Sequence, residues 1–236
     1  MKEHFLVSIF GEPDFTMEFL ELSFIVITAL TIICFYWAVG RDQRILGALA
    51  LWTAVVGWLA FSGFFENTNA VPPRILFLLL PLTGLAVLLY RAINADKVNL
   101  PLLTGIHIVR IPVELTLHEL YLRGKIPVIM TYVGWNFDIV VGFSAVLVLV
   151  YLLWKRSSAN VALLRVWNYF GLIMLSIIVV TAMLSAPGPQ QQLAFDQPNV
   201  AILSYPFTLL PGVVVPLVAL SHLLALKVLR QLPIKR

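Results

Sequence analysis

Charged residues are scarce in this chain. Asp, Glu, Lys and Arg make up 12% of its 236 residues, whereas 60% are hydrophobic. A soluble domain carries about 25% charged residues, because its surface must be polar. Lipid imposes no such demand, and a helix of roughly 20 apolar residues crosses a bilayer. The composition excludes an ordinary soluble domain and predicts an integral membrane protein.

Cysteine is nearly absent. The single one, Cys34, lies within an apolar run. A disulfide framework and a thiolate metal site both need more cysteines than this. Both are excluded, and we expect Cys34 to be a small apolar side chain in a helix.

A concentrated basic patch is missing as well. The net charge is +4 at pH 7, but the basic residues lie in short clusters between apolar runs. Such clusters mark the cytoplasmic loops of membrane proteins. We therefore expect the lipid bilayer as the main partner and no nucleic acid. An unknown small ligand or lipid, or a partner subunit in the membrane, stays open.

Apolar runs, by contrast, are abundant. They predict an all-α, polytopic transmembrane helix bundle in a single domain of residues 1–236. Residues 1–17 are expected to form an external or interfacial N-terminal segment. Seven spans are predicted, at residues 18–40, 45–65, 74–92, 101–123, 132–154, 161–186 and 206–229.

The fourth span is the uncertain one, since a helix on the membrane surface would leave six spans. Its polar residues include Arg110, Glu114, His118 and Glu119. Cytoplasmic loops collect Lys and Arg, and omitting this span would move the basic C-terminal end to the outside. We therefore predict seven spans, an external N terminus and a cytoplasmic C terminus.

A weak internal repeat is also visible. Segments 65–69 and 195–199 share Phe, an acidic residue and Asn at the same spacing, ahead of the third and seventh spans. Spans one to three would then match spans five to seven around a central fourth span, as parallel repeats do in some transporters.

One face of the fourth span is polar. His107, Arg110, Glu114, His118 and Tyr121 are spaced three, four, four and three residues apart, which places them on one side of a helix. Each ionisable group in lipid costs about 2.5 to 3.5 kcal/mol, so the stripe must face protein or water. Arg110 and Glu114, one turn apart, are expected to pair directly.

The fifth span adds polar groups to this stripe. The short connection 123–127 makes spans four and five antiparallel neighbours, so Asn136 should lie at the depth of Glu114 and Asp138 about one turn further in. The predicted ligand or proton site in the outer half of the membrane comprises Arg110, Glu114, His118, Glu119, Asn136 and Asp138. The alternative is a salt-bridge network that only holds two helices together.

A second polar cluster is expected nearer the cytoplasm. It comprises His107, Asn168, Ser221 and His222. Two histidines at one depth can be axial haem ligands or part of a proton relay, but a histidine in an apolar helix more often bonds to nearby backbone. We expect no cofactor.

A metal site is not expected either. Glu114, His118, Glu119 and Asp138 offer nitrogen and oxygen ligands. The second histidine of the zinc-protease motif is missing, however, and Arg110 would repel a cation.

The seventh span is predicted to be kinked or broken. It contains Pro206, Pro211 and Pro216, which should leave the carbonyls of Phe207 and Gly212 free. Broken helices often line sites near the bilayer midplane, although a plain proline kink is also common.

Several stretches resemble uncharacterised multi-spanning proteins of bacterial inner membranes. The stretches are Arg110-Ile-Pro112-Val-Glu114, Met130-Thr131, Asn136-Phe137-Asp138 and Val215-Pro216-Leu217 to Ser221-His222. The resemblance implies a bacterial inner-membrane protein and carries no activity.

Three functions fit these patterns. The first is transport of a small polar solute or protons. The second is a membrane-embedded enzyme acting on a lipid or quinone-like substrate, with Glu114, His118 and Asp138 as acid–base groups, although no catalytic residue can be assigned. The third is a sensor or assembly subunit that catalyses nothing.

Overall fold

The computed structural model describes residues 16–155 and 159–232, so nearly all of the predicted N-terminal segment 1–17 lies outside the described residues. Within the described ranges the chain forms helices and turns and no strands. The α-helices are α2 (Met17–Ala38), α3 (Gln43–Phe61), α4 (Leu76–Ala92), α5 (Leu100–Ile106), α6 (Arg110–Leu122), α7 (Asp138–Lys155), α8 (Val161–Ser185) and α9 (Val215–Gln231).

Six helical units are long and apolar enough to cross a membrane. Helices α5 and α6 form one of them, Leu100–Leu122, in which a single 3₁₀ turn at His107–Val109 joins the two parts. Another is Leu210–Gln231, which comprises α9 and the π-helical turn before it. The remaining helix, α4, has 17 residues and is shorter. The fold is therefore an apolar helical bundle that is compatible with an integral membrane protein.

Polar caps fix several helix starts. The side chains of Asp42, Asn99 and Asn160 accept hydrogen bonds from backbone N–H groups in the first turns of α3, α5 and α8, as N-cap residues do. Helix α7 begins six residues later than the predicted start of the fifth span at 132. Segment 131–137 is instead a turn, because Thr131 and Asn136 bond to nearby backbone groups.

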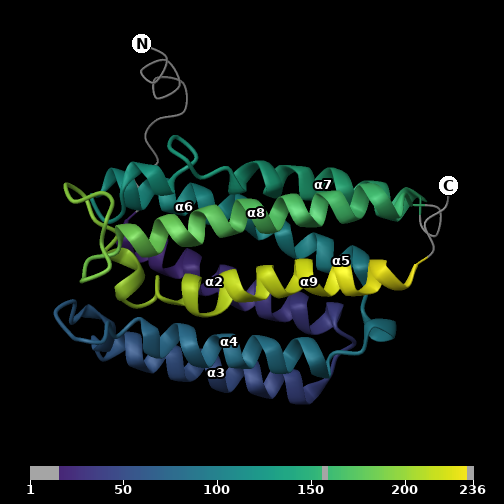
Figure 1. The fold of residues 1–236 in the computed structure, drawn as a ribbon, viewed down its shortest axis with the longest axis horizontal. Helices are drawn as coiled ribbons and strands as arrows, with labels where there is room; N and C mark the ends of the chain where they lie inside the picture. The colour runs from purple at the N-terminus through teal and green to yellow at the C-terminus, as the bar shows by residue number, and fades with distance from the viewer. Residues whose placement is uncertain (1–15, 156–158, 233–236) are drawn as a thin grey trace, which may run out of the picture.

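Hydrogen bonds gather the helix ends into two groups. At one end of the bundle, Lys227 Nζ donates to the carbonyls of Tyr90 and Ile93, and the N–H of Asn99 donates to the carbonyl of Ala38. At the other end, the connection between α8 and α9 bonds to the α6–α7 connection through Gln197 and Ile126, among others. Figure 1 shows the helices running between these two ends along the long axis of the molecule.

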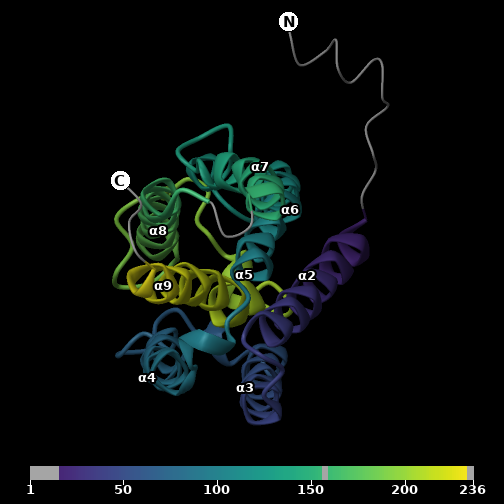
Figure 2. The same ribbon diagram turned by 90° about the vertical axis from the view of Figure 1, so that its right-hand side faces the viewer.

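The polar crossing lies in the middle of the bundle. In the view along the helices, α5 lies between α2 and α9, with α3 and α4 on one side and α6, α7 and α8 on the other (Figure 2). Helix α5 packs against α2, α9 and α7. Half of the α5–α6 window is buried, against 22% for α3. The helical unit with the most charge is thus half covered by its neighbours.

The seventh predicted span is irregular at its start but continuous from Leu210 to Gln231. Residues Leu210–Val214 form a π-helical turn before α9, a feature that often marks functional sites. The two carbonyls predicted to be free both have partners. The carbonyl of Gly212, which Pro216 deprives of its helical partner, accepts a hydrogen bond of 2.8 Å from Trp52 Nε1 on α3. The carbonyl of Phe207 accepts one of 3.0 Å from the N–H of Leu210.

Candidate functional site

Arg110 is the centre of the buried polar groups. Its side chain is 3% exposed, and its Nη1 forms an ion pair of 2.9 Å with Asp138 Oδ1 on α7. Its Nη2 lies 3.1 Å from His222 Nε2 on α9 and 3.5 Å from the carbonyl of Gly171 on α8. The predicted direct pair with Glu114 is wrong: the guanidinium turns toward the helices opposite and leaves its neighbour on α6. Arg110 therefore connects four helices.

Both ring nitrogens of His222 have a hydrogen-bond partner. Its Nδ1 lies 2.8 Å from Asn168 Oδ1, and Asn168 Nδ2 donates to the carbonyl of Leu164. Because an amide oxygen only accepts, the proton of this bond belongs to Nδ1. The Nε2 lone pair is then left to accept from Arg110, which can only donate. The two contacts together favour one neutral tautomer of His222.

His107 stacks on the same ring. The two imidazole centroids lie 3.8 Å apart with an interplanar angle of 19°, and Trp167 packs edge-on against both. His107 is 1% exposed, and neither of its ring nitrogens has a hydrogen-bond partner among the described residues. A buried imidazole of this kind has unused capacity to donate and to accept.

Neither haem nor a metal fits these residues. Axial ligands bind haem iron from opposite sides of the macrocycle, whereas His107 and His222 lie face to face with no space between them. Within residues 16–155 and 159–232, no group of three or more His, Cys, Asp or Glu side chains is arranged to hold a metal ion.

Glu114 and Asn136 meet on the side of Arg110 that faces the α6–α7 connection. Asn136 Nδ2 donates to Glu114 Oε1 at 2.5 Å and to the carbonyl of Met130 at 3.0 Å, while its Oδ1 accepts the N–H of Asp138. The second oxygen of Glu114 has no partner in the described part of the chain. Asn136 thus connects Glu114 to the first turn of α7, next to the ion pair of Arg110.

The two predicted clusters are therefore one. We call the Arg110 network the residues Glu114, Asn136, Asp138, Arg110, His222 and Asn168, together with His107 stacked on His222. All seven are buried, at 5% exposure or less. The sequence separated them into outer and inner groups because it did not show how far the long side chain of Arg110 reaches.

Three predicted site residues lie outside the network. Glu119 forms a partly exposed ion pair of 2.6 Å with Arg123. The ring of His118 lies beside Tyr132, with centroids 4.8 Å apart. Ser221 is buried, but its hydroxyl donates to the carbonyl of Leu217 in its own helix.

Gly171 is a site residue that the sequence analysis missed. A Cβ atom built on it would lie 2.3 Å from Cε1 and Nε2 of His222, which is well inside contact distance. Only glycine allows α8 to approach the ring this closely. The available signal was its position three residues after Asn168, which places both on one face of α8.

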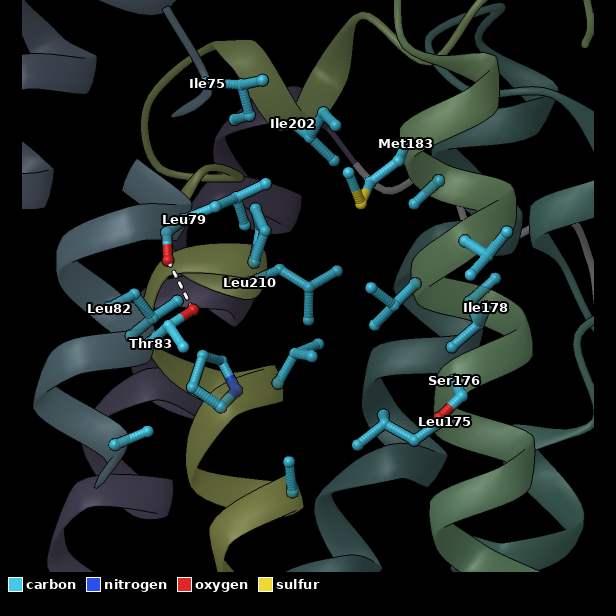
Figure 3. Close-up of a pocket in the computed structure, with 18 of the residues that line it drawn as sticks. Ile75, Leu79, Leu82, Thr83, Leu175, Ser176, Ile178, Met183, Ile202 and Leu210 are labelled. Atoms are coloured by element: carbon cyan, nitrogen blue, oxygen red, sulfur yellow. Dashed lines mark hydrogen bonds between the residues drawn. The ribbon is translucent and has the colours of Figure 1, made fainter. Parts of the chain in front are cut away.

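The network is set apart from the main cavities. One of them is an apolar groove of about 730 Å³ between α4 and α8 (Figure 3). Neither this groove nor the next three cavities, within the described ranges, is lined by Glu114, His118 or Asp138.

Comparison with known proteins gives one family. Its profile, described as a domain of unknown function (DUF8737), matches residues 74–230, more than half of the chain. The matched range runs from the start of α4 into α9 and includes every residue of the Arg110 network. No curated protein and no solved structure matches the chain.

Proposed function

We propose a function from one premise: the chain belongs to the DUF8737 family, whose description carries no activity, so the buried geometry supplies the hypothesis. The proposed function is that of a multi-pass membrane protein that moves protons, alone or together with a small polar solute, through the Arg110 network. The resemblance drawn from the sequence favours a bacterial inner membrane.

Seven crossings in one domain are part of this proposal. Helix α4 has 17 residues, the lower end of the range of about 17 to 25 that spans a bilayer. If it crosses, the N terminus and the C terminus lie on opposite sides.

Charge orients the bundle. Basic residues concentrate at the end where α9 finishes: Arg41, Arg44, Arg91, Lys97, Lys155, Arg165, Lys227 and Arg230. The opposite end has Arg74, Arg123 and Lys125 within the described residues. Because cytoplasmic loops are rich in Lys and Arg, the C-terminal end of α9 is assigned to the cytoplasm.

One observation carries the proposal: buried ionisable side chains from three helices, α6, α7 and α9, are connected through Arg110. Glu114 at the outer side has a carboxylate oxygen without a partner, and His107 at the inner side has two such nitrogens. These groups lie about 10 Å apart along the helix at 1.5 Å per residue. Ionisable groups buried in a membrane commonly mark ion and proton pathways.

The Arg110 network borders none of the described cavities, which favours protons over a larger solute as the transported species. A proton needs no cavity of its own, whereas a solute needs one. Where the network has no hydrogen bond, as at His107, the proton would cross by a water molecule or a turn of the ring. The network covers about a third of a hydrocarbon core of roughly 30 Å. Access from each side would therefore require opening, for which the π-helical turn at Leu210–Val214 offers a hinge. The enzyme hypothesis draws less support, because its three acid–base residues line none of the main cavities.

Two matched carboxylates on α6 provide the test. The purified protein is reconstituted into liposomes that contain a pH-sensitive dye, and proton entry is followed under an imposed membrane potential. Glu114→Gln keeps the acceptor for Asn136 but removes the titratable group, so proton entry should fall to the level of protein-free liposomes. Glu119→Gln, the same change in the ion pair outside the network, should leave it unchanged.

Either of two outcomes contradicts the proposal. One is a wild-type protein that admits no more protons than empty liposomes. The other is a folded Glu114→Gln variant, with wild-type circular dichroism and gel filtration, that admits protons at the wild-type rate. The second outcome would favour a network that only joins helices.

A further inference from the structure

The apolar groove between α4 and α8 has walls of hydrocarbon. Leu79, Leu82 and Thr83 on α4 face Leu175 and Ser176 on α8 across it, and the π-helical turn and α9 form its floor (Figure 3). The groove has a volume of about 730 Å³, and the Arg110 network has no part in it.

The two hydroxyls in the middle of its walls are already satisfied. Thr83 Oγ1 donates to the carbonyl of Leu79, and Ser176 Oγ donates to the carbonyl of Leu172, each at 2.8 Å. Both bonds lie within the helix that carries the hydroxyl. The middle of the groove therefore offers no free donor, and a polar ligand placed there would lose its hydrogen bonds to water without replacement.

The length of the groove suits a chain that lies along the membrane normal. On α4 its lining extends from Ile75 to Tyr90, which is about 22 Å of helix. One leaflet accounts for about half of a hydrocarbon core of roughly 30 Å. The groove thus runs from the outer end of the bundle past the membrane centre.

The volume of the groove suits a small ligand. About 730 Å³ lies within the range of about 300 to 1,000 Å³ that small-molecule sites have. The groove therefore has room for one lipid chain.

The outer end of the groove has a polar atom to offer, since Gln190 Oε1 has no hydrogen-bond partner among the described residues. At the outer end lie Gln190 and Ile202, from the connection between α8 and α9. At the inner end lies Tyr90, whose carbonyl accepts a hydrogen bond from Lys227 Nζ. A polar side chain thus stands at the mouth nearest the outer headgroups, with hydrocarbon below it.

We infer that this groove is a binding site for one acyl chain of an outer-leaflet phospholipid. The chain would lie between α4 and α8 along the membrane normal, with the glycerol end of the lipid near Gln190. The inference does not rest on proton movement by the Arg110 network.

A matched pair of residues on α8 tests it. Ser176 lines the groove, whereas Ile173, nearly one turn earlier, is exposed and does not line it. The full-length protein is extracted in a mild detergent, and bound lipids are counted by native mass spectrometry. The wild type and Ile173→Trp should each retain one phospholipid, and Ser176→Trp should lose it. Thr83→Trp, on the opposite wall, should lose it too and serves if Ser176→Trp does not fold.

The inference is overturned if the wild type retains no phospholipid or if the filled variants retain as much as Ile173→Trp. Retention of a prenyl quinone in place of the phospholipid would assign the groove to another ligand. A stable dimer whose contact covers α4 and α8 would assign it to a second copy.

Discussion

The Arg110 network and the apolar groove share helices α6, α8 and α9 and have opposite chemistry. On α9, His222 belongs to the network, while the adjacent Leu223 lines the groove. On α8, Gly171 contacts His222, and the adjacent Leu172 lines the groove. Successive residues of a helix point about 100° apart, so each helix presents one polar face inward and one apolar face to the groove.

The difference follows from what lipid does to each kind of group. Ionisable side chains are destabilising in hydrocarbon unless partners surround them, so the network is closed and fixed by hydrogen bonds. Apolar side chains lose no stabilising free energy in contact with lipid chains, so the groove can stay open. Changes in the network should therefore affect stability strongly, whereas changes in the groove should affect mainly what binds there.

The largest effect is expected from removing the central cation. Arg110→Leu leaves Asp138 buried without its counter-charge and removes the donor to His222. Loss of one partner from a buried ion pair destabilises a protein by about 3 to 5 kcal/mol. Equilibrium unfolding in detergent, followed by tryptophan fluorescence, measures the loss. Thr83→Leu in the groove wall is the control and should change the free energy of unfolding little.

A double variant sharpens this prediction. Arg110→Leu with Asp138→Leu removes both charges, and apolar replacement of a whole buried pair is often nearly neutral. The double variant should therefore be more stable than Arg110→Leu alone. Equal or greater destabilisation in the double variant would mean that the pair does not behave as a buried ion pair.

The next effect concerns the two glycines that differ most in their surroundings. Gly171→Ala would place a methyl group 2.3 Å from the ring of His222, whereas Gly84 on α4 has nothing within 4 Å of an added Cβ. Overpacking of this kind costs about 1 to 3 kcal/mol, so Gly171→Ala should lower the midpoint of thermal unfolding and Gly84→Ala should not. If both variants unfold like the wild type, the close approach of α8 to His222 is not present in solution.

Hydropathy was enough to predict the helices, because a run of apolar residues has few alternatives in lipid. The all-α fold and the resemblance to an uncharacterised family are confirmed. The start of the fifth span was predicted too early, since Thr131 and Asn136 are compatible with a span by hydropathy but fold into a turn. Sequence patterns detect apolarity better than local side-chain-to-backbone bonds.

The site could be predicted only in part. Helical spacing placed Glu114 and Asn136 at one depth, and they form a hydrogen bond. Spacing along one helix did not reveal that Arg110 prefers Asp138 on α7 to Glu114 on α6, since that depends on how the helices are rotated. The groove could not be predicted at all. It is a space left between apolar side chains of different helices, and the sequence does not show how those helices pack.

A smaller effect is expected at the π-helical turn before α9. Trp52→Phe removes the donor to the carbonyl of Gly212 but keeps an aromatic ring in place. A hydrogen bond contributes about 1 kcal/mol, so stability should fall slightly and hydrogen exchange should quicken in segment 208–216. Exchange unchanged in that segment would show that Trp52 does not restrain the π-helical turn.

The smallest effect is expected on proton entry through the Arg110 network when the groove is changed. Ser176 lies five residues after Gly171, about 140° around α8 at 100° per residue, and it shares no hydrogen bond with the network. Effects at sites without shared partners are largely independent. Ser176→Trp should therefore remove the bound lipid and leave proton entry into liposomes at the wild-type rate. If proton entry instead falls as far as in Glu114→Gln, lipid in the groove must control the network through α8, and the two regions would act as one site.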